Sequence, residues 1–125
     1  MIVEKRNKYV PFSGAAAAVV TPFSDGKVDL ESLGRVIDHL SDGGVGAVAV
    51  CGTTGEAPAL SVDEYREIVR FSCERVRGRI PVIAGAGGST TERAARLSEI
   101  AGECGAAAVL SVTPYYNKAS HEGLY

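Results

Sequence analysis

The chain lacks the features that mark several large classes of protein. It has no tryptophan, 6% aromatic residues and a net charge of −2, which argues against a base-stacking platform and against a basic stripe for nucleic acid. Its apolar runs fall well short of the roughly twenty residues that a membrane-spanning helix needs. We therefore expect neither a nucleic-acid partner nor a membrane partner.

Cysteine is scarce as well. Cys51, Cys73 and Cys104 are an odd number with no Cys-x-x-Cys pair, which is a poor framework for disulfides or zinc. Each lies in or beside an apolar segment, so we expect buried free thiols, no metal site and a reducing, cytoplasmic environment. The basic N-terminus precedes only a short apolar run, Ala15–Val20, below the apolar core of about 7–15 residues in a signal peptide. Secretion is therefore not expected.

Four short apolar runs recur at roughly thirty-residue intervals, the length of one strand-helix unit. They are Ala15–Val20, Val45–Cys51, Ile80–Gly85 and Ala106–Val112. All are rich in alanine, valine or isoleucine and almost free of charge. They predict strands of a parallel sheet that are buried on both faces.

Helical patterns separate these runs. Asp29–Ser41 carries apolar residues at three- and four-residue steps. Ser61–Glu64 and Ser89–Glu92 each have the Ser/Thr-x-x-Glu pattern of a capping box that opens a helix. Gly78 and Gly105 follow the second and third helical patterns, where a left-handed residue commonly ends a helix. The last six residues resemble the first turn of a fourth helix.

The order of these elements predicts an α/β fold with parallel strands and right-handed crossovers. Two architectures fit four strand-helix units: a small doubly wound sheet, and half of an eight-stranded (β/α)8 barrel. The pattern alone does not separate them. A chain of 125 residues is long enough for one small domain.

Sites in both architectures collect at the carboxyl ends of strands. The loop Gly52–Glu56 offers flexible glycines and two threonine hydroxyls for a carboxylate or a proton relay, or it is a turn before a helix. The loop Gly85–Thr90 resembles a phosphate-binding loop, but its place after the third strand favours a strand-to-helix turn. Tyr115 and Tyr116 either supply a phenol for proton transfer or are one core and one surface tyrosine.

Three further ionisable residues are weaker candidates. His39 and His121 have no metal-ligand partner nearby in the sequence, which favours ordinary surface histidines. Cys51 directly precedes the loop Gly52–Glu56, so a thiolate nucleophile is conceivable, although a buried, inert thiol is favoured.

Several motifs together resemble the dihydrodipicolinate synthase family. The most specific are Gly52–Glu56, with the sequence Gly-Thr-Thr-Gly-Glu, and Val112–Asn117, with the sequence Val-Thr-Pro-Tyr-Tyr-Asn. Val20–Phe23, Gly78–Gly85 and Glu122–Tyr125 match as well. The resemblance covers residues 13–125 and leaves residues 1–12 as an N-terminal extension. N-acetylneuraminate lyase and 2-keto-3-deoxy sugar-acid aldolases are related alternatives, which the paired threonines and Tyr-Tyr-Asn disfavour.

The resemblance implies a TIM barrel of which residues 13–125 form only the first four strands and three to four helices, a half-barrel. It implies a lyase that condenses pyruvate with L-aspartate 4-semialdehyde through a lysine Schiff base, in lysine and diaminopimelate biosynthesis. No cofactor is implied. The full-length form is expected to be a cytoplasmic homo-oligomer.

The same resemblance assigns roles to five residues. Thr53 and Tyr116 are catalytic proton-relay residues, with Tyr116 reaching into a neighbouring subunit. Thr54 and Gly55 bind substrate, Thr54 through the pyruvate carboxylate, and Tyr115 lies at the subunit interface. The resemblance also implies that the Schiff-base lysine belongs to a later strand. None of the chain's own lysines falls in an apolar run: Lys5, Lys8, Lys27 and Lys118. These 125 residues alone are therefore expected to be inactive, or else to be a non-catalytic interaction or regulatory fragment.

Overall fold

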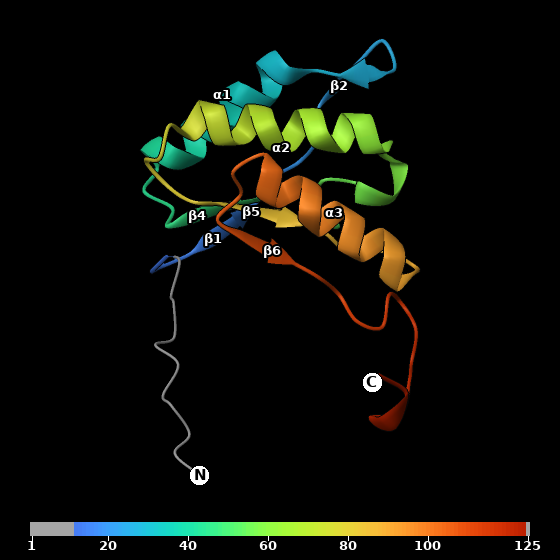
Figure 1. Ribbon diagram of the computed structural model, residues 1–125. Helices are drawn as coiled ribbons and strands as arrows, with labels where there is room; N and C mark the ends of the chain where they lie inside the picture. The colour runs from blue at the N-terminus through green and yellow to red at the C-terminus, as the bar shows by residue number, and fades with distance from the viewer. Residues whose placement is uncertain (1–11, 125) are drawn as a thin grey trace.

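The computed structural model describes residues 12–124 as a four-stranded sheet covered by three helices (Figure 1). The strands are β1 (Ala16–Ala18), β4 (Ala47–Val50), β5 (Val82–Gly85) and β6 (Ala108–Leu110), and the helices are α1 (Leu30–Asp42), α2 (Val62–Val76) and α3 (Thr91–Glu103). Each strand begins within two residues of the start of its predicted apolar run. The N-terminal extension expected over residues 1–12 lies almost entirely outside the described residues.

The sheet decides between the two architectures. Its strand order is β1-β4-β5-β6 with every neighbouring pair parallel, so the strands follow chain order without reversal. A doubly wound sheet reverses its order and carries helices on both faces. Here α1, α2 and α3 all cover the same face of the sheet (Figure 1). Successive strand-helix units of a (β/α)8 barrel have this arrangement.

The two faces of the sheet differ in burial. On the face toward the helices, Val48, Val82 and Ala84 are at most 2% exposed. The parallel register aligns a second row of side chains, on the opposite face, that is only partly covered: Ala18, Ala49, Ile83 and Ala108. One face is therefore the core of this domain, and the other is an apolar surface of mostly small residues.

Burial on both faces was expected for all four strands, and this is wrong for β1 and β6. These two are the edge strands, each with a single neighbour in the sheet. Val109 and Leu110 of β6 are 45% and 59% exposed. The central strands β4 and β5 are flanked on both sides and hold most of the buried positions. Burial thus follows the position of a strand in the sheet more than its composition.

The start of α2 confirms a sequence prediction. The Glu64 backbone N–H donates to the Ser61 hydroxyl, and the Ser61 backbone N–H donates to the Glu64 carboxylate at 2.8 Å, which completes a capping box. The carboxylate of Asp29 caps α1 by accepting the backbone N–H of Ser32 at 3.0 Å. Gly78 and Gly105 have positive φ just after α2 and α3, as expected.

The capping box expected at Ser89–Glu92 is wrong. The N-cap of α3 is Thr90, whose hydroxyl accepts the backbone N–H of Arg93 at 3.2 Å. Threonine is also a good N-cap residue. The helix therefore begins one residue later than expected, which puts Arg93 in the third helical position in place of Glu92.

A hairpin and two 3-10 turns complete the described chain, and the first of these turns, η1 (Ala57–Ala59), follows the loop Gly52–Glu56. β2 (Phe23–Ser24) pairs antiparallel with β3 (Lys27–Val28) around Asp25 and Gly26, both with positive φ. Asp-Gly is a strong local signal for such a hairpin, although none was predicted here. At the other end, the expected start of a fourth helix is the short 3-10 turn η2 (Glu122–Leu124).

Two glycines differ in the room they leave for a side chain. A Cβ on Gly85 would overlap the carbonyl oxygen of Cys51. A Cβ on Gly102, near the end of α3, would have nothing within 4 Å. We predict that Gly85→Ala lowers the free energy of unfolding by about 1–3 kcal/mol through overpacking. Gly102→Ala should raise it by up to about 1 kcal/mol, because alanine is the better helix former. Urea denaturation followed by circular dichroism measures both changes. Equal midpoints for the two variants would contradict the assigned close approach.

Candidate active site

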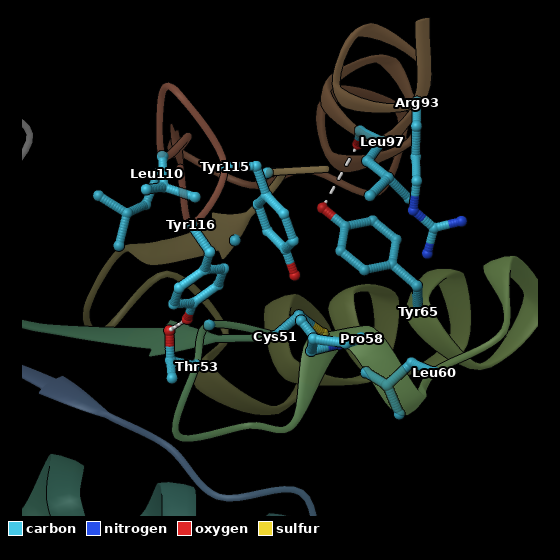
Figure 2. A pocket seen from close by; sticks show the side chains of 15 residues that line it. Cys51, Thr53, Pro58, Leu60, Tyr65, Arg93, Leu97, Leu110, Tyr115 and Tyr116 are labelled. Carbon is cyan, nitrogen blue, oxygen red and sulfur yellow. Dashed lines mark hydrogen bonds between the residues drawn. The ribbon is translucent and has the colours of Figure 1, made fainter. Parts of the chain in front are cut away.

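A pocket lies at the carboxyl ends of the strands, between the loops after β4 and β6 and the helices α2 and α3. Its cavity volume is about 90 Å³, and it is partly open to solvent. Fifteen residues line it (Figure 2). Thr53, Tyr115 and Tyr116 are among them, so the fold brings three of the five predicted site residues to one pocket.

Thr53 and Tyr116 form the polar centre of this pocket. The hydroxyl oxygens of the two side chains lie 2.7 Å apart, and either can donate the hydrogen bond (Figure 2). The residues come from the loops after β4 and β6 and belong to the same chain, so this pair forms without a second subunit. Tyr116 is 68% exposed and has a positive φ of 47°, which holds its side chain over the loop after β4. Two hydroxyls at this distance can pass a proton from one to the other.

Tyr115 supports the pair from the side. Its ring meets that of Tyr116 edge-on, with centroids 4.8 Å apart and an interplanar angle of 87°. Figure 2 shows the Tyr115 ring between those of Tyr116 and Tyr65. Tyr115 is half-buried and Tyr116 is exposed. One tyrosine can therefore pack in the interior while the other supplies a phenol for proton transfer, so the two alternatives given for this pair do not exclude each other.

Thr54 and Gly55 are placed differently from Thr53, because neither lines the pocket. Thr54 is exposed. Gly55 is buried, and its carbonyl accepts a 2.6 Å hydrogen bond from the hydroxyl of Thr21, which lies beyond β1. A Cβ on Gly55 would lie 3.1 Å from the backbone oxygen of Val19. Gly55 therefore fastens the loop after β4 to the end of β1 and so fixes the position of Thr53.

The other residues that the sequence suggested for a site lie in ordinary parts of the fold. The loop Gly85–Thr90 is a strand-to-helix turn that ends in the N-cap of α3. His39 lies in the last turn of α1. Among residues 12–124, no group of three or more His, Cys, Asp or Glu side chains could hold a metal ion. No helix in that part of the chain is long and apolar enough to cross a membrane.

Cys51 lines the pocket but is not a nucleophile. The side chain is 1% exposed, and burial raises the pKa of its thiol to about 12. The thiol is therefore protonated at neutral pH, whereas nucleophilic attack requires the thiolate. Its backbone has a positive φ of 54°, which turns the chain from β4 into the loop that carries Thr53.

The helices form a further side of the pocket, which the loop motifs do not indicate. Tyr65 of α2 and Leu97 and Arg93 of α3 line this side (Figure 2). The Tyr65 hydroxyl donates to the backbone carbonyl of Leu97 at 3.3 Å, which links the two helices. The helical spacing of Leu97 predicts a buried position, but no local signal indicates that these three residues lie beside the loops.

Residues 11–125 match the model of the Dihydrodipicolinate synthetase family. The chain belongs to this family. It is 47% identical over 114 residues to 4-hydroxy-tetrahydrodipicolinate synthase of Aquifex aeolicus and 50% identical over 114 residues to the protein of that name in Thermotoga neapolitana. Each match covers 91% of this chain and 39% of the relative. The chain thus spans about two fifths of the length of these curated members of the family.

Solved structures give the same result. The crystal structure of dihydrodipicolinate synthase from Aquifex aeolicus superposes with a TM-score of 0.85 at 47% identity and covers 90% of this chain and 39% of that one. The structure from Thermotoga maritima superposes with a TM-score of 0.87 at 47% identity, over 92% of this chain and 39% of that one. The predicted fold class, the first four strands of a family TIM barrel, is confirmed.

Cysteine reactivity tests the burial of this end of the sheet. We predict that iodoacetamide at about pH 8 labels Cys51 more slowly than Cys104, because the Cys51 thiol is buried and its raised pKa keeps the thiolate scarce. Cys73, whose pKa burial raises to about 11, should also react slowly. Peptide mass spectrometry gives the three rates. In urea the rates should converge, and labelling of folded Cys51 as fast as that of Cys104 would contradict the described packing.

Proposed function

We propose that this chain supplies the proton-relay half of the active site of a pyruvate-dependent condensing lyase. The observation that carries the proposal is the 2.7 Å hydrogen bond between Thr53 and Tyr116 at the carboxyl ends of the strands. Family membership supports it, as does the name 4-hydroxy-tetrahydrodipicolinate synthase of the relatives. The substrates we propose are pyruvate and L-aspartate 4-semialdehyde, in the biosynthesis of lysine and diaminopimelate.

The proposed reaction begins with a lysine amine that lies outside these 125 residues. The amine attacks the ketone carbon of pyruvate, and water leaves to give a Schiff base. Loss of a methyl proton gives an enamine, whose carbon attacks the aldehyde carbon of the semialdehyde. Thr53 and Tyr116 carry protons to and from these centres, and Thr54 and Gly55 hold the pyruvate carboxylate. This chemistry needs no metal and no cofactor.

The lysines of the described residues support a nucleophile located elsewhere. A Schiff-base lysine needs a lowered pKa, which burial or a neighbouring cation provides. Lys27 lies in the exposed hairpin strand β3 and Lys118 in the exposed segment after the paired tyrosines. Neither belongs to the four-stranded sheet.

The exposed edge strands support the same proposal. Leu110 at 59% exposure and Val112 at 48% leave an apolar surface beside the pocket. In the longer protein that we propose, further strand-helix units pair with β6 and β1 and close the barrel. The full-length protein acts as a cytoplasmic homo-oligomer, with Tyr115 at the subunit interface.

The relay generates a kinetic prediction for the full-length enzyme. Thr53→Val and Tyr116→Phe should each lower kcat by about 10²–10⁴-fold, the usual contribution of a positioned proton-transfer group. The double variant should be no slower than the worse single variant, because the two hydroxyls act as one unit. Steady-state condensation of pyruvate with aspartate semialdehyde measures all three.

Thr91→Val is the matched control for this series. Thr91 is an exposed threonine at the start of α3 and does not line the pocket, so its replacement should leave kcat unchanged. Unchanged kcat in Thr53→Val would contradict the proposed relay. So would a double variant whose loss of kcat equals the product of the two single losses.

A further inference from the structure

Thr21 has a buried hydroxyl that links two separate segments of the chain. Among residues 12–124, Thr21 and Ser72 are the buried members of the serine and threonine residues. The Ser72 hydroxyl bonds to the carbonyl of Ile68 within its own helix, α2, at 2.7 Å. The Thr21 hydroxyl instead donates at 2.6 Å to the carbonyl of Gly55, 34 positions away. This hydrogen bond holds the loop after β4 against the segment after β1.

The segment that carries Thr21 is itself held on both sides. Before Thr21, the backbone N–H of Val19 donates to the carbonyl of Ala49 in β4 at 2.9 Å. After it, the carbonyl of Pro22 accepts the backbone N–H of Asp29, the N-cap of α1, at 2.8 Å. The Thr21 hydroxyl is therefore a fixed donor to which the loop after β4 is tied.

Gly55 connects this anchor to Thr53. The backbone N–H of Glu56 donates to the Thr53 carbonyl at 3.1 Å, so Gly55 lies inside a turn that begins at Thr53. The turn is closely packed at Gly55, where an added Cβ would lie 3.1 Å from the backbone nitrogen of Cys51. A shift of the Gly55 carbonyl therefore shifts the Thr53 backbone with it. Because the Thr53 side chain is exposed, this backbone mainly decides where its hydroxyl lies.

We propose that Thr21 is a positioning residue for the proton relay. Through the Gly55 carbonyl, its hydroxyl keeps the Thr53 hydroxyl within 2.7 Å of that of Tyr116. Thr21 does not line the pocket, so it acts without touching the substrate. The inference rests on the proposed function, because Thr21 has this role only if the pair of Thr53 and Tyr116 carries protons. Proton transfer is sensitive to such positioning, since a displacement of about 1 Å can cost about 100-fold in rate.

Three variants of the full-length enzyme test this role. Thr21→Val keeps the branched shape and removes the donor, so it should lower kcat about 10–100-fold through the misplaced Thr53 hydroxyl. Thr21→Ser keeps the hydroxyl and should retain a kcat close to that of the parent enzyme. Ser72→Ala is the matched control, because it removes a buried hydroxyl that bonds only within α2. It should lower the melting temperature, as Thr21→Val does, and leave kcat unchanged.

A double variant separates positioning from a general loss of stability. In the Tyr116→Phe background, Thr21→Val should cause little further loss of kcat, because the relay is already broken. A residue that only stabilises the fold would lower kcat by the same factor in both backgrounds. Crystal structures of the full-length Thr21→Val variant and its parent should show the hydroxyl oxygens of Thr53 and Tyr116 farther apart in the variant.

Three outcomes would overturn this role of Thr21. They are a normal kcat in Thr21→Val while Thr53→Val is slow, a Thr21→Ser variant as slow as Thr21→Val, and an equal loss with and without the Tyr116 hydroxyl. Unchanged kcat in Thr53→Val is a different result, because it would overturn the proposed relay and with it the role of Thr21.

Discussion

The parallel register of the sheet is the constraint on which the other features depend. Val50 pairs with Ala84 and Gly85 with Leu110, so β4, β5 and β6 end at the same edge. The loops after them meet there, which brings Thr53 and Tyr116 together across 63 positions of sequence. A slip of one residue would turn the buried side chains to the open face and separate these loops. Gly85 is a point of close approach in this register, because β5 passes against the carbonyl of Cys51.

Much of the fold could be predicted because its signals are local. The apolar runs, the three-to-four-residue spacing of the helices and the Ser61–Glu64 box each depend on residues close together in the chain, and the structure confirms them. The threonine pair and the tyrosine pair were singled out because strand ends carry sites in parallel α/β folds. The local patterns left a barrel and a doubly wound sheet open, the family resemblance implied the barrel, and the strand order agrees with it.

The remaining features depend on contacts distant in sequence. Position in the sheet left Val109 and Leu110 exposed, although their composition matches that of the buried central strands. Two adjacent residues can both cap a helix, so the choice of Thr90 over Ser89 is a matter of how the loop after β5 packs. No local pattern places Arg93 in the pocket, because it looks like any exposed helix residue until the packing of α2 against α3 is known. Gly55 serves as an anchor through Thr21, a contact 34 positions away.

We propose that these residues form one half of a site whose other half contains a Schiff-base lysine. The most direct test of this proposal is the intact mass after incubation with pyruvate and borohydride, of the 125-residue chain and of the protein purified from its native source. The 13.0 kDa chain should stay unmodified, and a protein more than twice its mass should gain a reduced pyruvate adduct on a lysine beyond Tyr125. An adduct on Lys27 or Lys118, or a larger protein without any adduct, would contradict it.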